Sequence, residues 1–347
     1  MIRIKFLSRL PATLWMHQFP HNEPQWGNCH FIFDTQAREY DWLVVYDDIP
    51  DLDGMSRDKA HEELACSPKH TLLVTTEPSS IKIYGEDYTR QFDAVLTSQA
   101  EWALPHRQRI FTQPALHWFY GVSERHVTPF DEMIALPERK NKMVSMVYSA
   151  KSMRHTLHHR RAAFMRGLMQ RLPDMDVFGR DSVHALDDKA DCLRDYRYHV
   201  AIENFIGEHH WTEKLADAFI GETLPFYAGC PNAAAYFPEQ SFIPIDMRNV
   251  DAAVHTIQLA IANNEYEKRL PAIREARRRV LYEYNLFAVL AREIEVRHDA
   301  SARGVSGTHL LSRRAMRAGS VAVALRDLYG KLRGRVLSLP GMMGGRS

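Results

Sequence analysis

A short polar stretch between a predicted strand and a predicted helix holds the side chains best suited to chemistry. Residues 198–204 (YHVAIEN) predict a buried strand that ends in Glu203 and Asn204, and residues 212–214 (TEK) predict the start of a helix. The first turn of a helix offers free N–H groups and a partial positive charge, and Lys214 adds a full positive charge there. This combination favours the binding of a diphosphate.

Two further apolar runs place these side chains in a larger unit. Residues 224–227 and 242–246 predict strands, and the helical stretch before the first of them makes a βαβ unit of a parallel sheet. Open parallel sheets bind ligands beyond the carboxyl ends of their strands. We therefore expect the polar residues at 203, 204, 213 and 214 to share that edge.

Length and composition are typical of a globular protein with more than one domain. The 347 residues are 45% hydrophobic and 25% charged, which suits two domains of about 150 residues each. The four cysteines form no Cys-x-x-Cys pair, so neither a disulfide framework nor a zinc site is indicated, and a cytoplasmic location is expected. No apolar run is long enough to span a membrane, and residues 1–19 lack the apolar core of a signal peptide.

Apolar runs separated by turns predict a parallel sheet in each half of the chain. The runs of the first half lie at 2–6, 30–33, 42–46, 71–76, 94–97 and 110–112, and those at 143–148 and 176–178 begin the second half. The polar stretch 137–142 between them predicts a domain boundary. We expect domains at 1–140 and 141–298, followed by a basic tail at 299–347.

The motifs of the second half resemble the carboxyl-terminal signature of glycosyltransferase family 10, the α1,3/1,4-fucosyltransferases, in a bacterial-type form. The resemblance covers roughly residues 143–290 and is weaker in the first half, where it rests on residues 75–78 (TTEP); its motifs are 198–204, 212–214, 224–229 (LPFYAG) and 241–246 (SFIPID). It implies an α/β fold of GT-B type, with two Rossmann-like domains facing across a cleft. The first would hold the acceptor sugar and the second GDP-fucose, and neither a cofactor nor a bound metal is required.

The resemblance also implies roles for several donor-side residues. Lys214 would meet the diphosphate, Glu213 the ribose or fucose, and Asn204 another part of the donor. Arg161, on a predicted basic helix at about 155–172, has the family's spacing to an aromatic residue and would reach the phosphates, with Arg160 as the alternative. Without the resemblance, a helix-start Glu-Lys pair capped by Thr212 would be the simpler interpretation.

Three weaker donor-side candidates lie near these motifs. His210 stands where the family often has an aromatic hydroxyl, so the contact to the donor sugar is open. Arg180 and Lys189 precede the signature strand and match a similar Gly-Arg and Asp-Lys in related sequences, although a surface loop is an equal interpretation. The i,i+4 pair of His155 and His159 has the spacing of metal ligands, but no nearby acid completes such a site.

Glu77 is the candidate general base in the first half of the chain. An inverting transfer needs a base to take the proton of the acceptor hydroxyl as its oxygen attacks C1. Glu77 follows a predicted strand and precedes Pro78, in a Thr-x-Glu stretch similar to the one that carries the family's base. An ordinary loop glutamate is the alternative role for Glu77, and Asp47 and Asp48, at the end of another strand, are alternative bases.

The tail predicts a basic amphipathic helix. Val321, Leu325, Leu328, Leu332 and Val336 recur at helical spacing. Residues 301–347 hold nine Arg or Lys and one acid, a net charge of +8, which leaves −7 on the rest. This pattern favours contact with an anionic membrane surface, for instance on the inner face of the cytoplasmic membrane, over packing on the body. The scarcity of aromatic residues argues against nucleic acid.

Together these features predict an inverting fucosyltransferase that moves L-fucose from GDP-fucose to a hydroxyl of a glycan or lipopolysaccharide-type acceptor. A GT-B enzyme that uses a different nucleotide sugar is one alternative, and a non-catalytic glycan- or membrane-binding relative is another. The sequence has no Gly-x-Gly-x-x-Gly, P-loop, Gly-x-Ser-x-Gly or His-Glu-x-x-His motif, which argues against dehydrogenases, kinases, hydrolases and zincins.

Overall fold

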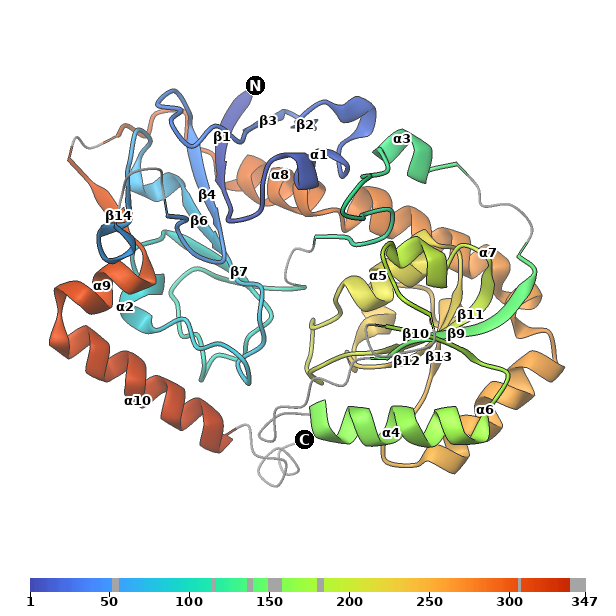
Figure 1. The fold of residues 1–347 in the computed structure, drawn as a ribbon. Coiled ribbons are helices and arrows are strands. Elements are labelled where there is room, and N and C mark those ends of the chain that lie inside the picture. The colour runs from blue at the N-terminus through green and yellow to red at the C-terminus, as the bar shows by residue number, and fades with distance from the viewer. Residues whose placement is uncertain are drawn as a thin grey trace. The chain divides into compact units, whose positions relative to one another are not determined.

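The chain forms two compact units, each built on its own sheet (Figure 1). The structure is a computed structural model and describes residues 1–51, 56–113, 117–135, 140–148, 158–179, 184–304 and 307–337. The first unit comprises Met1–Ala115 together with Leu286–Ser347, and the second comprises Leu116–Asn285. The chain therefore returns to its first unit after completing the second.

The sheet of the first unit is parallel except at one edge. Its strands follow the order β2-β3-β1-β4-β6-β7-β8, and only the β2–β3 pair is antiparallel. The strands are β1 (Ile2–Leu7), β2 (Gln25–Trp26), β3 (Cys29–Ile32), β4 (Trp42–Tyr46), β6 (Thr71–Val74), β7 (Ala94–Thr97) and β8 (Arg109–Phe111). The strand order reverses between β1 and β4, which makes the carboxyl ends of these two strands a topological switch point.

Alternate residues of each strand enter separate cores on the two faces of this sheet. Ile4 and Val44 pack in a cluster with Trp15 of α1 (Thr13–Met16) and with α8 (Leu286–Arg297). Leu43 and Val45 enter the other cluster, which includes residues of α2 (Glu86–Thr89) and the loop before it. Both faces of the sheet are covered, as expected for strands that read as continuous apolar runs.

The sheet of the second unit is wholly parallel, in the order β10-β9-β11-β12-β13. Its strands are β9 (Lys142–Val147), β10 (Asp176–Phe178), β11 (Tyr196–Ile202), β12 (Leu224–Ala228) and β13 (Ile243–Pro244). Here the order reverses between β9 and β11. The predicted strand that ends in Glu203 and Asn204 is thus confirmed and borders the switch point of this sheet.

Helices cover both faces of the second sheet (Figure 1). One core joins the sheet to α4 (His158–Arg171) and α6 (Val250–Ala262), and the other joins it to α5 (Glu213–Ile220) and to the end of α7 (Glu265–Arg278). Along β11, Val200 and Ile202 face the first core, and Ala201 faces the second. The predicted βαβ unit is therefore present as β11, α5 and β12.

The compact units differ from the predicted boundaries at residues 140 and 298, for two physical reasons. Residues 117–135 precede the first strand of the second sheet, but their backbone and side chains pack on that unit. The backbone N–H groups of Phe119 and Tyr120 donate to Asp217 of α5, and Phe130 of α3 (Phe130–Met133) enters its core. At the other end, α8 belongs to the core of the first sheet although the sequence joins it to α7.

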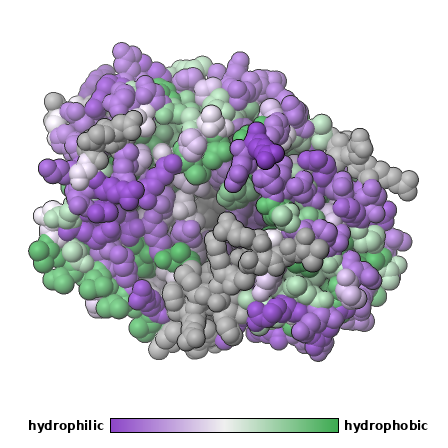
Figure 2. All heavy atoms as spheres, viewed as in Figure 1, coloured by the Kyte–Doolittle hydropathy of each residue, from purple (hydrophilic) through white to green (hydrophobic). Residues whose placement is uncertain are grey.

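The tail is part of the first unit and includes the predicted amphipathic helix. Strand β14 (His309–Leu311) pairs with β5 (His61–Glu63), and α9 (Arg313–Gly319) and α10 (Val321–Leu337) follow. The apolar stripe of α10 points outward: Val321 is 78% exposed and Leu325 61%. Figure 2 shows apolar side chains at the lower left, over this helix. Within the ranges that the structure describes, no helix is long and apolar enough to cross a membrane.

Candidate functional site

The end of β11 and the start of α5 are joined by a buried carboxylate. Glu203 is fully buried, and its two oxygens accept hydrogen bonds from the N–H (2.8 Å) and the hydroxyl (2.6 Å) of Thr212. Thr212 is the N-cap of α5, and its hydroxyl accepts from the N–H of Lys214. Glu203 thereby fixes the first turn of α5 beside the strand end, so its role is to build the site.

Lys214 lies on this first turn and is held by two carboxylates. Its Nζ is 2.6 Å from Oε1 of Glu213 and 3.8 Å from Oε2 of Glu203, and its side chain is 20% exposed. Burial opposes ionisation of Glu213, but Lys214 and Lys189 outweigh it and lower the pKa of Glu213 to about 2. The Glu213–Lys214 pair is therefore ionised at neutral pH, with an ammonium at the helix start as predicted.

A second cation, Arg161 of α4, reaches the end of β11. Its Nη1 donates to the side-chain oxygen of Asn204, which brings two predicted donor-binding residues together. Arg161 is only 7% exposed, and its Nε has no hydrogen-bond partner among the residues that the structure describes. A buried guanidinium donor without a partner carries a cost that an anionic oxygen would remove.

Lys189 approaches the same cluster from the loop before β11. Its Nζ is 3.5 Å from Oδ2 of Asp217, one turn along α5 from Glu213. Burial raises the pKa of Asp217 to about 6, although Lys189 lowers it. The structure thus places the ammonium groups of Lys189 and Lys214 beside the same helix, α5. From the sequence, a surface loop was an equal interpretation for Lys189.

The remaining predicted residues of this region are placed differently. His210 is buried, its ring meets Phe205 edge-on at 5.3 Å, and burial lowers its pKa to about 4, so the imidazole is neutral at pH 7. Arg180 and His155 lie outside the residues that the structure describes, as does the side chain of His159. The prediction for Arg180 stays a prediction.

A cavity of 1270 Å³ opens at the carboxyl ends of β12 and β13. Its wall includes Arg160 and Ile206, close in sequence to Arg161 and Asn204, and the segments 227–231 and 244–248. Tyr227 at its wall donates to Glu203, which links the cavity to the charged cluster. The cations of the charged cluster (Arg161, Lys189 and Lys214) therefore lie near a largely apolar cavity.

Glu77, the candidate base, lies in the first unit at the carboxyl edge of its sheet. It follows β6 by three residues and its side chain is exposed. The Nε2 of Gln99, which follows β7, donates to the Glu77 carbonyl at 2.7 Å. The backbone of Glu77 is therefore hydrogen-bonded to the segment that follows the next strand of the sheet.

The alternative bases are occupied by other contacts, and Asp48 accepts from Arg9 and from the N–H groups of Ile49 and Arg313. The oxygens of Asp47 accept from Lys82 (2.6 and 2.7 Å), from the hydroxyl of Tyr84 (2.5 Å) and from Thr76 (3.0 Å). Burial raises the pKa of Asp47, but Lys82 and these hydrogen bonds outweigh it and lower the pKa. A carboxylate with this many donors is a poor proton acceptor.

Comparison with known proteins relates most of the second unit to a known family. Residues 137–269 match the sequence model described as glycosyltransferase family 10 (fucosyltransferase) C-term. The α-(1,3)-fucosyltransferase FucT of Helicobacter pylori is 34% identical over 89 residues, which cover 24% of this chain and 19% of that protein. These matches relate residues 137–269 to the carboxyl-terminal domain of glycosyltransferase family 10.

The solved structures that match this chain include α1,3-fucosyltransferases. A crystal structure of an α1,3-fucosyltransferase matches with a TM-score of 0.50 at 17% identity, covering 87% of this chain and 90% of the other. A structure of α1,3-fucosyltransferase with GDP-fucose has a TM-score of 0.49 at 16% identity, covering 88% and 93%. Together with two Rossmann-like units, the first of these matches confirms the predicted GT-B fold.

The family match contains the charged cluster but not the edge of the first sheet. Arg161, Asn204 and Lys214 lie within residues 137–269, whereas Glu77 and Asp47 lie outside them. Lys82, Tyr84 and Gln99, which fix the segment around Glu77, were not predicted from the sequence. The sequence marks these residues only by their position, because each lies in a turn or loop near the end of a predicted strand.

Proposed function

We propose that this protein is an inverting fucosyltransferase of glycosyltransferase family 10 that uses GDP-fucose as donor and a saccharide hydroxyl as acceptor. The observation that carries the proposal is the pair of cations, Arg161 and Lys214, at the switch point of the second sheet. Ligands of open parallel sheets bind at this point, and a diphosphate is the part of a nucleotide sugar that needs two cations.

The donor would be held by groups that the protein has already placed. Arg161 would turn its Nε–H, which has no partner among the described residues, to a phosphate oxygen, and Lys214 would share its ammonium between Glu213 and the diphosphate. Asn204 and Glu213 would orient the ribose or the fucose by hydrogen bonds. The neighbouring cavity of 1270 Å³ is large enough for a nucleoside.

The transfer step needs one base and a stabilised leaving group. In the proposed reaction, the acceptor oxygen bonds to C1 of fucose as its proton passes to Glu77. The bond between C1 and the phosphate oxygen breaks on the opposite face, and GDP departs with the electron pair. Arg161 and Lys214 would stabilise the negative charge that grows on GDP, so no metal ion is needed for this step.

Donor choice tests this proposal most simply. We expect GDP-fucose to raise the melting temperature of the protein. We also expect the protein to transfer fucose from it to at least one member of a panel of saccharide acceptors. GDP-mannose and UDP-sugars should be turned over at least ~10-fold more slowly, a difference of about 1.4 kcal/mol. If no GDP-sugar shifts the melting temperature, the reading as a GDP-sugar enzyme fails.

A different nucleotide sugar is the second candidate donor, and His210 is the observation that favours it. The family often has an aromatic hydroxyl at this position, whereas here a buried, neutral imidazole presents a different set of donors and acceptors. This candidate would be supported if the wild-type protein prefers another GDP-sugar in the same panel and the His210→Tyr variant prefers GDP-fucose.

We also propose that α10 docks on an anionic membrane near a lipid-linked or surface-glycan acceptor. Its apolar stripe is exposed along its length, with Leu328 and Leu332 53% and 50% exposed, and the tail carries +8 against −7 on the rest. Binding to vesicles with anionic lipid, but not to neutral ones, is expected, and Leu328→Glu with Leu332→Glu should abolish it. Equal binding to neutral vesicles would contradict the role of charge.

A further inference from the structure

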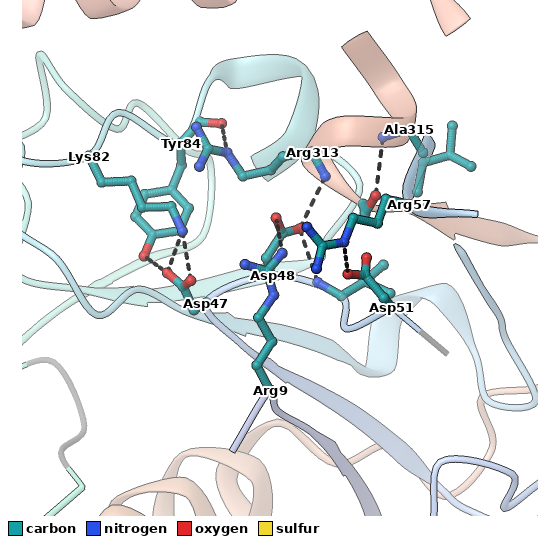
Figure 3. A network of polar contacts seen from close by, with 12 residues as sticks. Arg9, Asp47, Asp48, Asp51, Arg57, Lys82, Tyr84, Arg313 and Ala315 are labelled. Atoms are coloured by element: carbon teal, nitrogen blue, oxygen red, sulfur yellow. Dashed lines mark hydrogen bonds and ion pairs between the residues drawn. The ribbon is translucent and has the colours of Figure 1, made fainter. Parts of the chain in front are cut away.

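A network of polar side chains at the carboxyl edge of the first sheet has no part in the transfer step described above (Figure 3). It begins at Asp47, directly after β4 and beside the switch point of that sheet. Asp47 has a backbone φ of 75°, a left-handed conformation that residues other than glycine rarely adopt. Such a conformation persists where the surroundings hold it in place, and it occurs often at functional sites.

Lys82 and Tyr84 supply that support. The two oxygens of Asp47 accept from Lys82, and one of them also accepts from the buried hydroxyl of Tyr84. Lys82 lies over the Tyr84 ring at 4.7 Å. Figure 3 shows the three side chains pointing toward one another. Lys82 and Tyr84 therefore connect the loop that follows β6 to the residue that follows β4.

The same loop carries Glu77, and the network reaches it through the backbone. The Tyr84 hydroxyl accepts from the N–H of Thr76 at 2.9 Å, and Thr76 donates its own hydroxyl to Asp47. Gln99 donates to the carbonyls of both Glu77 (2.7 Å) and Lys82 (2.9 Å). The backbone at Thr76 and Glu77 is thus held by the side chains of Tyr84 and Gln99.

The tail completes this network from a distant part of the sequence. Arg313, the first residue of α9, is 10% exposed, and its guanidinium donates to the carbonyls of Ile83 (2.5 Å) and Tyr84 (3.2 Å). Its backbone N–H donates to Asp48 at 3.1 Å, and its guanidinium lies 5.4 Å from the centre of the Tyr84 ring. Arg313 therefore fixes the residues that hold Asp47 and Thr76.

We propose that Asp47, Lys82 and Tyr84 form a positioning frame for Glu77, and that Arg313 of the tail is a member of this frame. The proposal rests on the proposed role of Glu77 as the base. It assigns positioning, not proton transfer, to Asp47, whose oxygens are occupied. It also gives the tail a function in the transfer step, separate from membrane docking.

Two small substitutions test the frame in the full-length protein. Tyr84→Phe removes one hydroxyl oxygen and leaves the ring, and Arg313→Ala removes the tail's contact with the loop. Each should lower kcat by about 10- to 100-fold, the effect of a misplaced catalytic group. The GDP dissociation constant, which reports on the second unit, should stay within about twofold of the wild-type value.

Arg314→Ala is the matched control, because this neighbouring arginine is exposed and pairs with Asp58 at the surface. Arg314→Ala removes one positive charge from the tail, as Arg313→Ala does, but it should leave kcat unchanged. If kcat is unchanged in both Tyr84→Phe and Arg313→Ala while Glu77→Gln abolishes transfer, the frame is overturned and the proposed function stands. If the wild-type protein transfers no sugar from any GDP donor, the proposed function fails and the frame fails with it.

Discussion

The two sheet edges that carry the candidate residues are built in different ways. At the end of β11 the important side chains come from neighbouring segments, and the polar groups are buried against one another: Glu203 is fully buried and Arg161 7% exposed. At the end of β6 the candidate base is exposed, and the groups that fix its loop come from the segments after β4 and β7 and from the tail. The first arrangement suits a ligand that always has the same charged diphosphate. The second places the candidate base in an exposed position, which suits a variable acceptor.

The largest test of this contrast is the loss of the base. Glu77→Gln should lower kcat by about 10² to 10⁴-fold, the usual contribution of a general base, and leave the GDP dissociation constant unchanged. Turnover of GDP-fucose and calorimetry with GDP measure the two quantities. Glu86→Gln, which alters an exposed glutamate of the same unit, is the control. Unchanged turnover in Glu77→Gln would end the base assignment.

Removal of the helix-start cation should affect the other edge. Lys214→Ala should lower kcat by about 10² to 10³-fold, because it removes charge stabilisation of departing GDP and leaves Glu213 without its closest partner. GDP binding should weaken as well, in contrast to Glu77→Gln. Lys268→Ala, at an exposed lysine of α7, is the control. A variant with full activity would show that the diphosphate binds elsewhere.

The pH dependence of stability should report on the buried strand of the second unit. His199 of β11 is 3% exposed and hydrogen-bonds to Ser145, and its burial lowers its pKa to about 3. Between its unfolded value near 6.5 and pH 3, the unfolded chain binds a proton that the folded protein does not. Stability therefore falls as pH falls through this window, by about 2 kcal/mol between pH 6.5 and pH 5.

Urea denaturation at pH 7 and pH 5 measures this effect. His199→Asn, which can keep a hydrogen bond to Ser145, should lose about 2 kcal/mol less than the wild type over the same pH change. An equal loss in the two proteins would mean that His199 already titrates in the folded state.

The smallest expected effect is at Asn204. Its side-chain oxygen accepts from Arg161, so Asn204→Ala should leave the guanidinium less well oriented and weaken GDP binding by about 10-fold, the value of one hydrogen bond. Calorimetry with GDP measures this change, and Asn263→Ala, at the exposed end of α6, is the control. Equal affinity in Asn204→Ala would remove this residue from the donor site.

The difference between the two edges also explains what could be predicted from the sequence. The strands that end near Asn204 and Glu77 are apolar runs bounded by polar turns, and their predicted positions agree with β11 and β6 to within two residues. The charged cluster was predictable because Asn204, Glu213 and Lys214 lie within eleven residues of sequence and carry a family signature.

The frame around Glu77 had no such signal. Asp47, Lys82 and Arg313 are separated by 35 and 231 residues, and each contact depends on how the loops and the tail pack. The role of Glu203 was equally hidden, because a strand-end glutamate looks the same in sequence whether it meets a ligand or caps a helix through Thr212. Residues 117–135 gave no sign that Asp217 would hold them to the second unit.

The most direct test is a crystal structure of the protein with GDP. We expect the diphosphate at the start of α5, within hydrogen-bond distance of Lys214 Nζ and of the guanidinium of Arg161, with the guanosine in the adjoining cavity. A GDP molecule bound away from β11 and α5, with Lys214 still paired only to Glu213, would contradict it.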